Sequence, residues 1–204
     1  MRSLCLLDMG SDRRDERRAR VFAAALAAAA QAAPGPVRVA DIAARAQMSA
    51  GHVMYYFGDR ERIVVETLLY AERELAATRD RRLKRITDAR AALESLVWLY
   101  LPTSRADGRW RLWAQLLARA PEDPASRTAV AEVIDGWNAA FEAVIRDGAE
   151  AGQWECGDPA RTAYDLCRLM DGYALEQLLG RRGATRRWAH QAVMETAERL
   201  LNLS

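Results

Sequence analysis

The chain has 204 residues, of which 50% are hydrophobic and 28% charged, so it can bury a core and is not a disordered chain. Forty residues are Ala, whereas Pro (6) and Gly (12) are scarce, and this composition favours an all-α fold over a β-sandwich. The formal net charge of +2 excludes a strongly basic coat for non-specific nucleic-acid binding, although it leaves room for a local basic face.

The cysteines indicate neither a disulfide framework nor a zinc site. Cys5, Cys156 and Cys167 are scattered and form no C-x-x-C pair, which agrees with a reducing compartment. No uncharged apolar run is long enough to span a bilayer. We therefore expect a cytoplasmic protein with no metal, no cofactor and no membrane partner, and we expect residues 1–10 to form a frayed tail.

Residues that end helices, chiefly proline and glycine, divide the N-terminal part into four predicted helices. The first covers 12–33 and is Ala-rich, and Pro34-Gly35-Pro36 ends it. A short helix over 39–46 has apolar residues at helical spacing, and Ser49 is a good N-cap for a second short helix over 50–56. Asp59 can cap a long helix that runs from 60 to about 86.

Longer helices are expected further along, over 89–101, 107–119, 125–149, 159–179 and 185–201. Asp158-Pro159 is typical of a helix start, with Asp at the N-cap and Pro at the first helical position. The sequence thus predicts an all-α protein of about nine helices. Its expected organisation is a tail (1–10), a three-helix helix-turn-helix domain (11–60), a connecting helix (61–87) and a C-terminal helical domain (88–204).

The most informative stretch runs from Val39 to Leu69. Two short helices joined by a tight turn are the helix-turn-helix arrangement, in which the second helix enters the major groove of DNA. Ile42 and two small alanines pack the first helix against the second, and Val53 and Phe57 face the core. The remaining face of the second helix is then free to meet a groove wide enough for one helix.

This stretch resembles the DNA-binding domain of the tetracycline-repressor (TetR) family. The matching residues are Asp41-Ile42-Ala43, Ala46, Met48-Ser49, Gly51, Val53, the aromatic run Tyr55-Tyr56-Phe57, and Asp59-Arg60-Glu61 at the start of a helix. The sequence departs from the family pattern at Arg38, Gln47, His52 and Met54. Gln47 stands where the family has a turn glycine, so it must tolerate a less favourable backbone geometry. These departures affect which operator is read more than whether DNA is bound.

The resemblance implies roles for individual residues. Ala50, Gly51 and Tyr55 are expected nearest the base edges, and Tyr56 and Arg60 on phosphates. The position of Arg60 at a helix N-terminus favours an anion independently of the family. The alternative for the two tyrosines is that they are partly buried aromatic residues of the helix. Arg13, Arg14, Arg17 and Arg18 are expected to form a solvated face. The predicted DNA-binding set is Arg38, Arg45, Ser49, Ala50, Gly51, His52, Tyr55, Tyr56 and Arg60.

The C-terminal half places aromatic residues at helical spacing, most of which are expected in the core. It resembles the subset of the family with BetI-like C-terminal domains, which implies an effector pocket between these helices for an unknown small molecule. Asp171 near the aromatic rings could help to bind a cation, or it could serve only a helix contact. The predicted pocket wall is Trp110, Trp113, Trp137, Phe141, Met170 and Tyr173.

The last two helices are predicted to pair with their copies in a homodimer. The helix over 159–179 is apolar on more than one face and so needs more than one partner. Two-fold symmetry would match a palindromic DNA operator. The predicted interface is Leu175, Leu178, Leu179, Ala189, Val193 and Thr196.

The predicted function is that of a dimeric transcriptional regulator, a repressor that releases its double-stranded operator when an effector binds. An enzyme is the first alternative, but no Gly-rich phosphate loop, no G-x-S-x-G motif and no metal-ligand spacing is present, so we expect no enzymatic activity. A second alternative is an all-helical dimeric interaction module that has lost DNA binding, which Met54 and Gln47 leave open.

Overall fold

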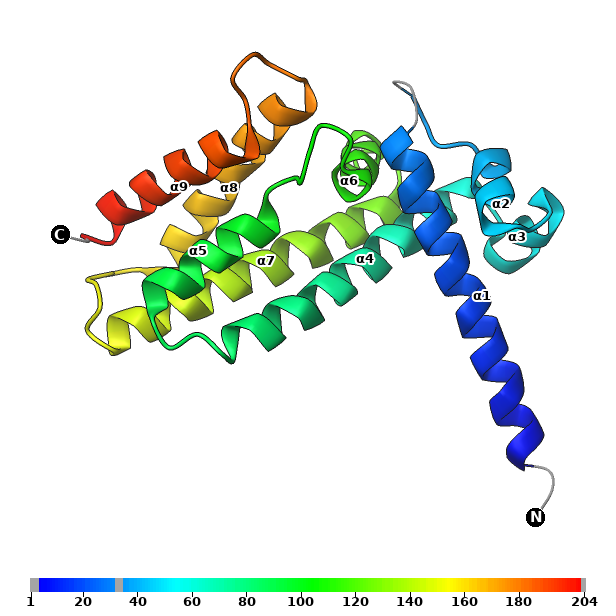
Figure 1. The fold of residues 1–204 in the computed structure, drawn as a ribbon, viewed down its shortest axis with the longest axis horizontal. Helices are drawn as coiled ribbons and strands as arrows, with labels where there is room; N and C mark the ends of the chain where they lie inside the picture. The colour runs from blue at the N-terminus through cyan, green and yellow to red at the C-terminus, as the bar shows by residue number, and fades with distance from the viewer. Residues whose placement is uncertain (1–3, 32–34, 203–204) are drawn as a thin grey trace.

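A computed structural model describes residues 4–31 and 35–202, with side chains from residue 14 onward. Within these residues the chain forms nine helices and no strand (Figure 1). Their bounds are α1 (Leu4–Gln31), α2 (Val39–Ala46), α3 (Ala50–Phe57), α4 (Arg60–Leu83), α5 (Ala89–Tyr100), α6 (Gly108–Arg119), α7 (Pro124–Glu150), α8 (Pro159–Leu178) and α9 (Arg186–Leu200). No helix in this described part is long and apolar enough to cross a membrane.

The predicted all-α fold and the predicted helices are confirmed, and most helix ends differ by at most one residue. Two ends differ by more, and the predicted end of the first helix (residues 32–33) lies outside the described residues. Helix α1 begins at Leu4, so residues 4–10 are helical where a frayed tail was expected; residues 1–3 lie outside the described part. Leu and Met are good helix formers, and no proline separates this segment from the rest of α1. Helix α4 ends at Leu83 rather than near residue 86, because a turn follows in which the amides of Arg85 and Ile86 bond to carbonyls three residues back.

Side-chain caps fix most of the helix starts. In each case the cap accepts a hydrogen bond from the backbone N–H three residues further on, which satisfies one of the free amides of the first turn. The capping residues are Ser49, Asp59, Asp88, Asp107, Asp123, Asp158 and Thr185.

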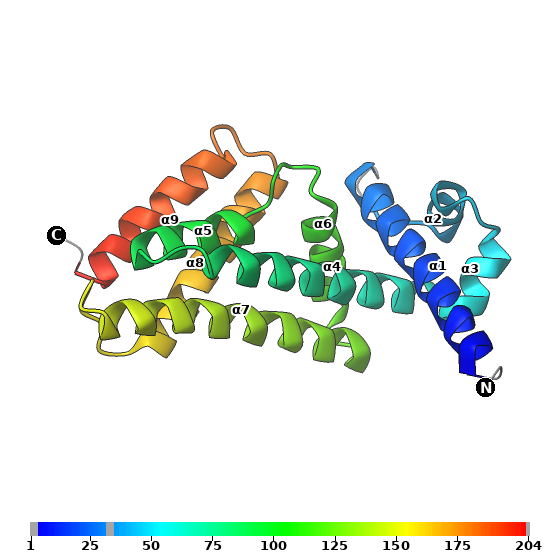
Figure 2. The same ribbon diagram turned by 60° about the horizontal axis from the view of Figure 1, so that its bottom comes forward.

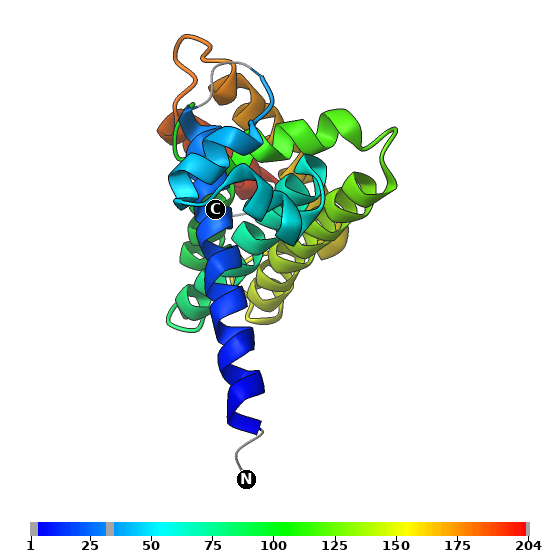
Figure 3. The ribbon, with the colours of Figure 1, turned by 90° about the vertical axis from the view of Figure 1, so that its right-hand side faces the viewer.

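The helices form two bodies joined by α4. Helices α1, α2 and α3 lie at one end, and α5 to α9 form the larger body, into which α4 extends beside α7 (Figures 1 and 2). The view onto the small body shows the N-terminal part of α1 extending beyond the rest of the molecule (Figure 3). Because α1 also packs on α4 and α6, the small body is held on two helices of the larger one.

Two close contacts define this junction. Gly108 at the start of α6 lies against the backbone of Leu26 in α1, so closely that a Cβ atom on Gly108 would stand 2.2 Å from the Leu26 carbonyl oxygen. Arg60 at the start of α4 donates from Nε to the carbonyl of Val37 (2.7 Å) and from a terminal nitrogen to the side chain of Gln115 in α6 (2.9 Å). The position of the small body is therefore set by backbone as well as side-chain contacts.

Candidate functional sites

Helices α2 and α3 form the predicted helix-turn-helix pair. Helix α2 buries Ile42, Ala43 and Ala46, which lie on one face. Gln47 ends the helix in the left-handed region (φ 56, ψ 45), and the turn closes with a bond from the amide of Met48 to the carbonyl of Ala43 (2.9 Å). A non-glycine residue thus adopts the conformation that the family pattern assigns to glycine.

Helix α3 is held by its inner face and leaves its outer face open. Val53 and Phe57 are buried in the core of the small body, and the Ser49 hydroxyl caps the helix by accepting from the amide of His52 (3.1 Å). Tyr55 is 84% exposed, and nothing lies within 4 Å of the place where a Cβ on Gly51 would be. A helix held by its inner face therefore presents an accessible outer surface.

The exposed face of α3 also carries a stacked pair of rings. His52 and Tyr56 lie nearly parallel with centroids 5.2 Å apart. The Tyr56 hydroxyl accepts a hydrogen bond from the guanidinium of Arg17 in α1 (3.0 Å). Arg17 thereby joins the exposed edge of this surface, and it supplies a positive charge that the predicted set did not include.

The basic residues differ in how free they are to bind an anion. Arg38 is exposed, and its side chain has no hydrogen-bond or ion-pair partner among the described residues. Arg45 is exposed but donates to the side chain of Gln31 (2.6 Å). Arg18 is not part of a solvated face, because it forms an ion pair with Glu66 and lies over the rings of Phe22 and Phe57.

The predicted phosphate role of Arg60 needs correction. Its Nε and both terminal nitrogens are engaged within the protein, by Val37, Glu61 and Gln115. The helix-terminus argument located the residue correctly at the start of α4, but a part-buried guanidinium with three internal bonds stabilises the junction instead of awaiting an anion. The other DNA-binding assignments remain predictions.

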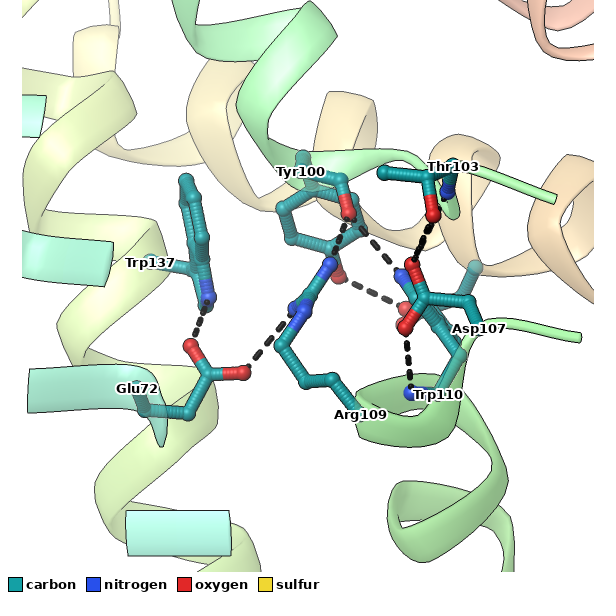
Figure 4. Close-up of polar contacts among 8 residues, drawn as sticks. Glu72, Tyr100, Thr103, Asp107, Arg109, Trp110 and Trp137 are labelled. Carbon is teal, nitrogen blue, oxygen red and sulfur yellow. Dashed lines mark hydrogen bonds and ion pairs between the residues drawn. The ribbon is translucent and has the colours of Figure 1, made fainter. Parts of the chain in front are cut away.

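The larger body contains a cluster of aromatic and charged side chains, which we call the aromatic chamber (Figure 4). It encloses about 20 Å³, the space of a single water. Glu72 of α4 accepts from Arg109 (2.9 Å) and from the indole nitrogen of Trp137 (2.9 Å), and its side chain is only 12% exposed. The chamber is lined by Glu72, Tyr100, Arg109, Trp110, Trp113, Val133, Ile134 and Trp137.

Arg109 supplies the positive charge of this chamber. Its guanidinium lies 5.4 Å from the ring centroid of Trp110 and donates to the carbonyl of Tyr100 (2.7 Å), besides its ion pair with Glu72 (Figure 4). The indole nitrogen of Trp110 donates to the same carbonyl (3.0 Å). The carboxylate and the rings are thus satisfied from within the chain, as buried polar groups must be.

The structure brings together only part of the predicted pocket wall. Trp110, Trp113 and Trp137 line the chamber. Phe141 and Met170 are fully buried in the core and do not line it. Tyr173 lies elsewhere: it packs edge-on against Trp188 of α9 with centroids 4.9 Å apart.

Asp171 does not face the chamber as a free carboxylate. It accepts from the hydroxyl of Tyr100 (2.6 Å) and from Arg168 one turn away (3.1 Å). Burial raises its pKa, although both of these partners act to lower it. Of the two roles that the sequence left open for Asp171, the structure therefore shows the helix contact.

The carboxylate of the chamber is Glu72, which sequence reasoning missed. It lies in the connecting helix, outside the predicted effector domain. The spacing of the sequence did indicate that Glu72 faces inward, because it follows the buried Leu68 by four residues and so lies on the same face of α4.

The predicted dimer interface needs a similar correction. Ala189 and Val193 are fully buried within the chain itself, so a second copy cannot cover them, and the Thr196 hydroxyl donates to the carbonyl of Ala192 in its own helix. Leu178 is half-buried, whereas Leu175 and Leu179 are exposed in the single chain, and their place in an interface stays a prediction. The large apolar residues that α8, the residue after it and α9 leave exposed, which we call the exposed apolar face, are Tyr164, Leu175, Leu179, Trp188 and Leu200.

These features define the class of protein: an all-helical chain with an exposed helix-turn-helix at one end and a separate helical domain at the other. A family model of bacterial regulatory proteins, tetR family, matches residues 21–67. A second model, for the C-terminal domain of BetI-type transcriptional repressors, matches residues 89–202. The chain belongs to the TetR family of bacterial regulatory proteins, with a C-terminal domain of the BetI type.

Individual relatives agree with this membership. The HTH-type transcriptional regulator BetI of Paraburkholderia phymatum is 31% identical over 116 residues, which are 56% of this chain and 59% of that protein; the match thus spans less than two thirds of the relative. A transcriptional regulator from Saccharomonospora viridis, solved in complex with choline, is 28% identical with a TM-score of 0.81, covering 90% of this chain and 96% of the other. The transcriptional regulator FadR of Bacillus subtilis, in complex with stearoyl-CoA, shares the fold at 16% identity (TM-score 0.71, 88% of this chain and 96% of the other covered).

Proposed function

We propose that this TetR-family regulator binds a palindromic DNA operator through α3, as a dimer, and that a small-molecule effector in the C-terminal domain releases it. The observation that carries the DNA-binding role is the outer face of α3. Its inner face is locked in the core while Tyr55, 84% exposed, and the open Gly51 project from the other side. An exposed aromatic ring beside an open backbone suits close approach to base edges.

The test of DNA binding compares Tyr55→Ala with the unchanged protein, using operator DNA selected from random sequences. Because Tyr55 makes little contact with the protein, its removal should leave the unfolding free energy within about 0.5 kcal/mol and weaken operator binding at least tenfold in a fluorescence-anisotropy titration at fixed salt. Glu74→Ala, an exposed change on α4 remote from α3, is the control. Equal operator affinity of all three proteins, or failure to select any DNA, would refute the role.

The proposed dimer rests on the exposed apolar face of α8 and α9. Single exposed apolar residues need no explanation, but several on two adjacent helices indicate a protein surface that is covered in the assembly. Leu175→Glu combined with Leu179→Glu should convert the dimer to a monomer in light scattering. Leu117→Glu is the matched control, since Leu117 is 44% exposed but lies on α6. A monomeric unchanged protein at micromolar concentration would contradict the proposal.

The proposed effector class is a small organic cation that binds in the aromatic chamber. A carboxylate surrounded by indole and phenol rings is the arrangement that holds quaternary ammonium groups, and the related Saccharomonospora protein binds choline. The chamber has no room for such a ligand while Arg109 occupies it, so the cation must displace the guanidinium from Glu72. Glu72→Gln should therefore abolish choline binding in calorimetry, and Glu74→Gln, on the exposed face of the same helix, should not.

A further inference from the structure

A second cavity lies directly outside the aromatic chamber. It encloses about 470 Å³ between α4, α5 and the first turns of α6 and α9, a volume within the usual range for small-ligand pockets. Arg109 lines both spaces and so separates them. We call this outer cavity the vestibule; it is lined by Leu75, Arg82, Trp98, Leu99, Leu101, Thr103, Asp107, Arg109 and Arg186.

The vestibule carries an excess of positive charge. Three arginines line it, and Asp107 is its only acidic lining residue among the described part of the chain. Asp107 is already engaged, because it caps α6 through the amide of Trp110 and accepts from both the amide and the hydroxyl of Thr103 (Figure 4). One carboxylate that is bonded to its own loop cannot also bind three guanidiniums.

Two of these guanidiniums have donors to spare. Arg82 has no hydrogen-bond or ion-pair partner for its side chain among the residues that the structure describes. Arg186 lies over the ring of Trp98 (5.1 Å) and donates to the Trp98 carbonyl, but its Nε is buried without a partner. Burial lowers the pKa of Arg186, and the nearby charges of Arg109 and Arg82 lower it further while Asp107 opposes them. Like charges held together around a buried, unpaired donor point to an anion.

We propose that the vestibule binds the carboxylate of a zwitterionic ligand whose quaternary ammonium group enters the aromatic chamber. This inference rests on the proposed effector role of the chamber and names the ligand class more closely. The vestibule offers the charge-assisted donors that a carboxylate prefers, and the chamber offers Glu72 and the rings for the ammonium end. The carboxylate end meets a guanidinium donor that the chain leaves unpaired, and the ammonium end meets Glu72, whose internal partner Arg109 it displaces.

Because Arg109 must leave Glu72 when a ligand binds, a zwitterion fits this site better than a simple cation. A cation alone must break the Arg109–Glu72 ion pair and leave a guanidinium, now unpaired, beside two others. A zwitterion replaces Arg109 at Glu72 and at the same time supplies a carboxylate to which the displaced guanidinium can turn. The net charge of the site is unchanged, so no buried charge is left alone.

Three probes of nearly equal size separate these contributions. Glycine betaine carries both charges, choline carries only the ammonium, and 3,3-dimethylbutanoate is the betaine isostere in which carbon replaces the charged nitrogen. With the full-length protein in isothermal titration calorimetry, betaine should bind at least tenfold more tightly than either single-charge probe. Equal or tighter binding of choline, or equal binding of 3,3-dimethylbutanoate, would overturn the proposal.

Variants of the vestibule test the location of the carboxylate. Arg186→Gln and Arg82→Gln should each lower betaine affinity at least fivefold. They should leave choline affinity unchanged or raise it, because choline binding leaves Arg109 unpaired beside these guanidiniums. Arg81→Gln, exposed on the same turn of α4 as Arg82, should alter neither affinity. A parallel loss of both ligands, or no loss of betaine, would refute the assignment. Operator binding in the absence of ligand is measured alongside. If it persists while betaine shows no preference, the vestibule inference alone has failed; if it is absent, the proposed function has failed.

Discussion

Gly108 offers a sharp test of how the two bodies are joined. It occupies the first position of α6, and a Cβ there would lie 2.2 Å from the carbonyl oxygen of Leu26 and 3.0 Å from its carbonyl carbon. These are backbone atoms of α1, so no side chain can rotate to make room. The change Gly108→Ala must therefore move α1 away from α6, or shift both.

The expected cost follows from two opposing effects. Forcing an extra carbon into a close-packed contact destabilises by about 1–3 kcal/mol, while replacing Gly by Ala within a helix stabilises by up to about 1 kcal/mol. We expect the packing effect to exceed the helix effect, with a net loss of about 1–2 kcal/mol. Gly136→Ala is the control, because nothing lies within 4 Å of a Cβ at this mid-helix position in α7, and it should stabilise by about 0.5–1 kcal/mol.

The assay is urea unfolding followed by circular dichroism, with all proteins at the same protomer concentration because assembly contributes to the apparent stability. The reasoning would be refuted if Gly108→Ala unfolded at the same urea concentration as the unchanged protein, or at a higher one, while Gly136→Ala behaved as expected. If Gly108→Ala and Gly136→Ala both lowered the unfolding free energy, the gain expected from replacing Gly in a helix would be wrong. Gly172→Ala, where a Cβ also has nothing within 4 Å, is therefore measured as a second reference for that gain.

Three further predictions follow from single residues. Gly51→Leu should weaken operator binding at least tenfold in anisotropy titrations and leave the protein at least as stable in urea, because nothing lies within 4 Å of a Cβ at this position and Gly is the poorer helix former. Asp107→Asn should be less stable than the unchanged protein at pH 7, and the difference in unfolding free energy should close as pH falls below about 4. Burial raises the pKa of Asp107, but the bonds from Thr103 and Trp110 and the charge of Arg109 leave that pKa lowered in the folded protein. The stability that the carboxylate contributes is therefore present above its unfolded pKa and is lost as pH falls through the folded value. Cys167 should resist maleimide labelling in the native protein and react after unfolding, because burial raises the pKa of its thiol to about 12. The half-buried Cys156 should react sooner in the native protein, and mass spectrometry of the labelled peptides would show the difference.

The local part of the structure could be predicted from the sequence because short-range chemistry decides it. From α2 onward, Asp and Ser caps, prolines at first helical positions and apolar residues at helical spacing place the helix ends within a few residues. The helix-turn-helix follows in the same way, since its two helices are adjacent in the chain and Gln47 has only to close one turn. None of this requires knowledge of residues that are distant along the sequence.

Contacts between distant segments could not be predicted in this way. Arg60 has the position of a phosphate ligand by every local criterion, yet Gln115, 55 residues away, accepts from its guanidinium. Val193 has the apolar character of an interface residue but is buried on the side of α9 that faces its own chain. Apolar residues at helical spacing indicate which side of a helix is covered, but not whether the same chain or a second copy covers it.

The placement of Gly108 and Arg109 side by side gives the proposed effector a short route to the DNA-binding body. Gly108 touches the backbone of α1, and the next residue, Arg109, holds Glu72 of α4, the helix that begins at the helix-turn-helix. A ligand that removes Arg109 from Glu72 frees the first turn of α6 from α4, and that turn cannot move without disturbing its contact with Leu26. The energetic coupling between the two sites is then the difference in ligand affinity between the two positions of this turn. Gly108→Ala, which separates the turn from α1 without any ligand, should reduce that difference.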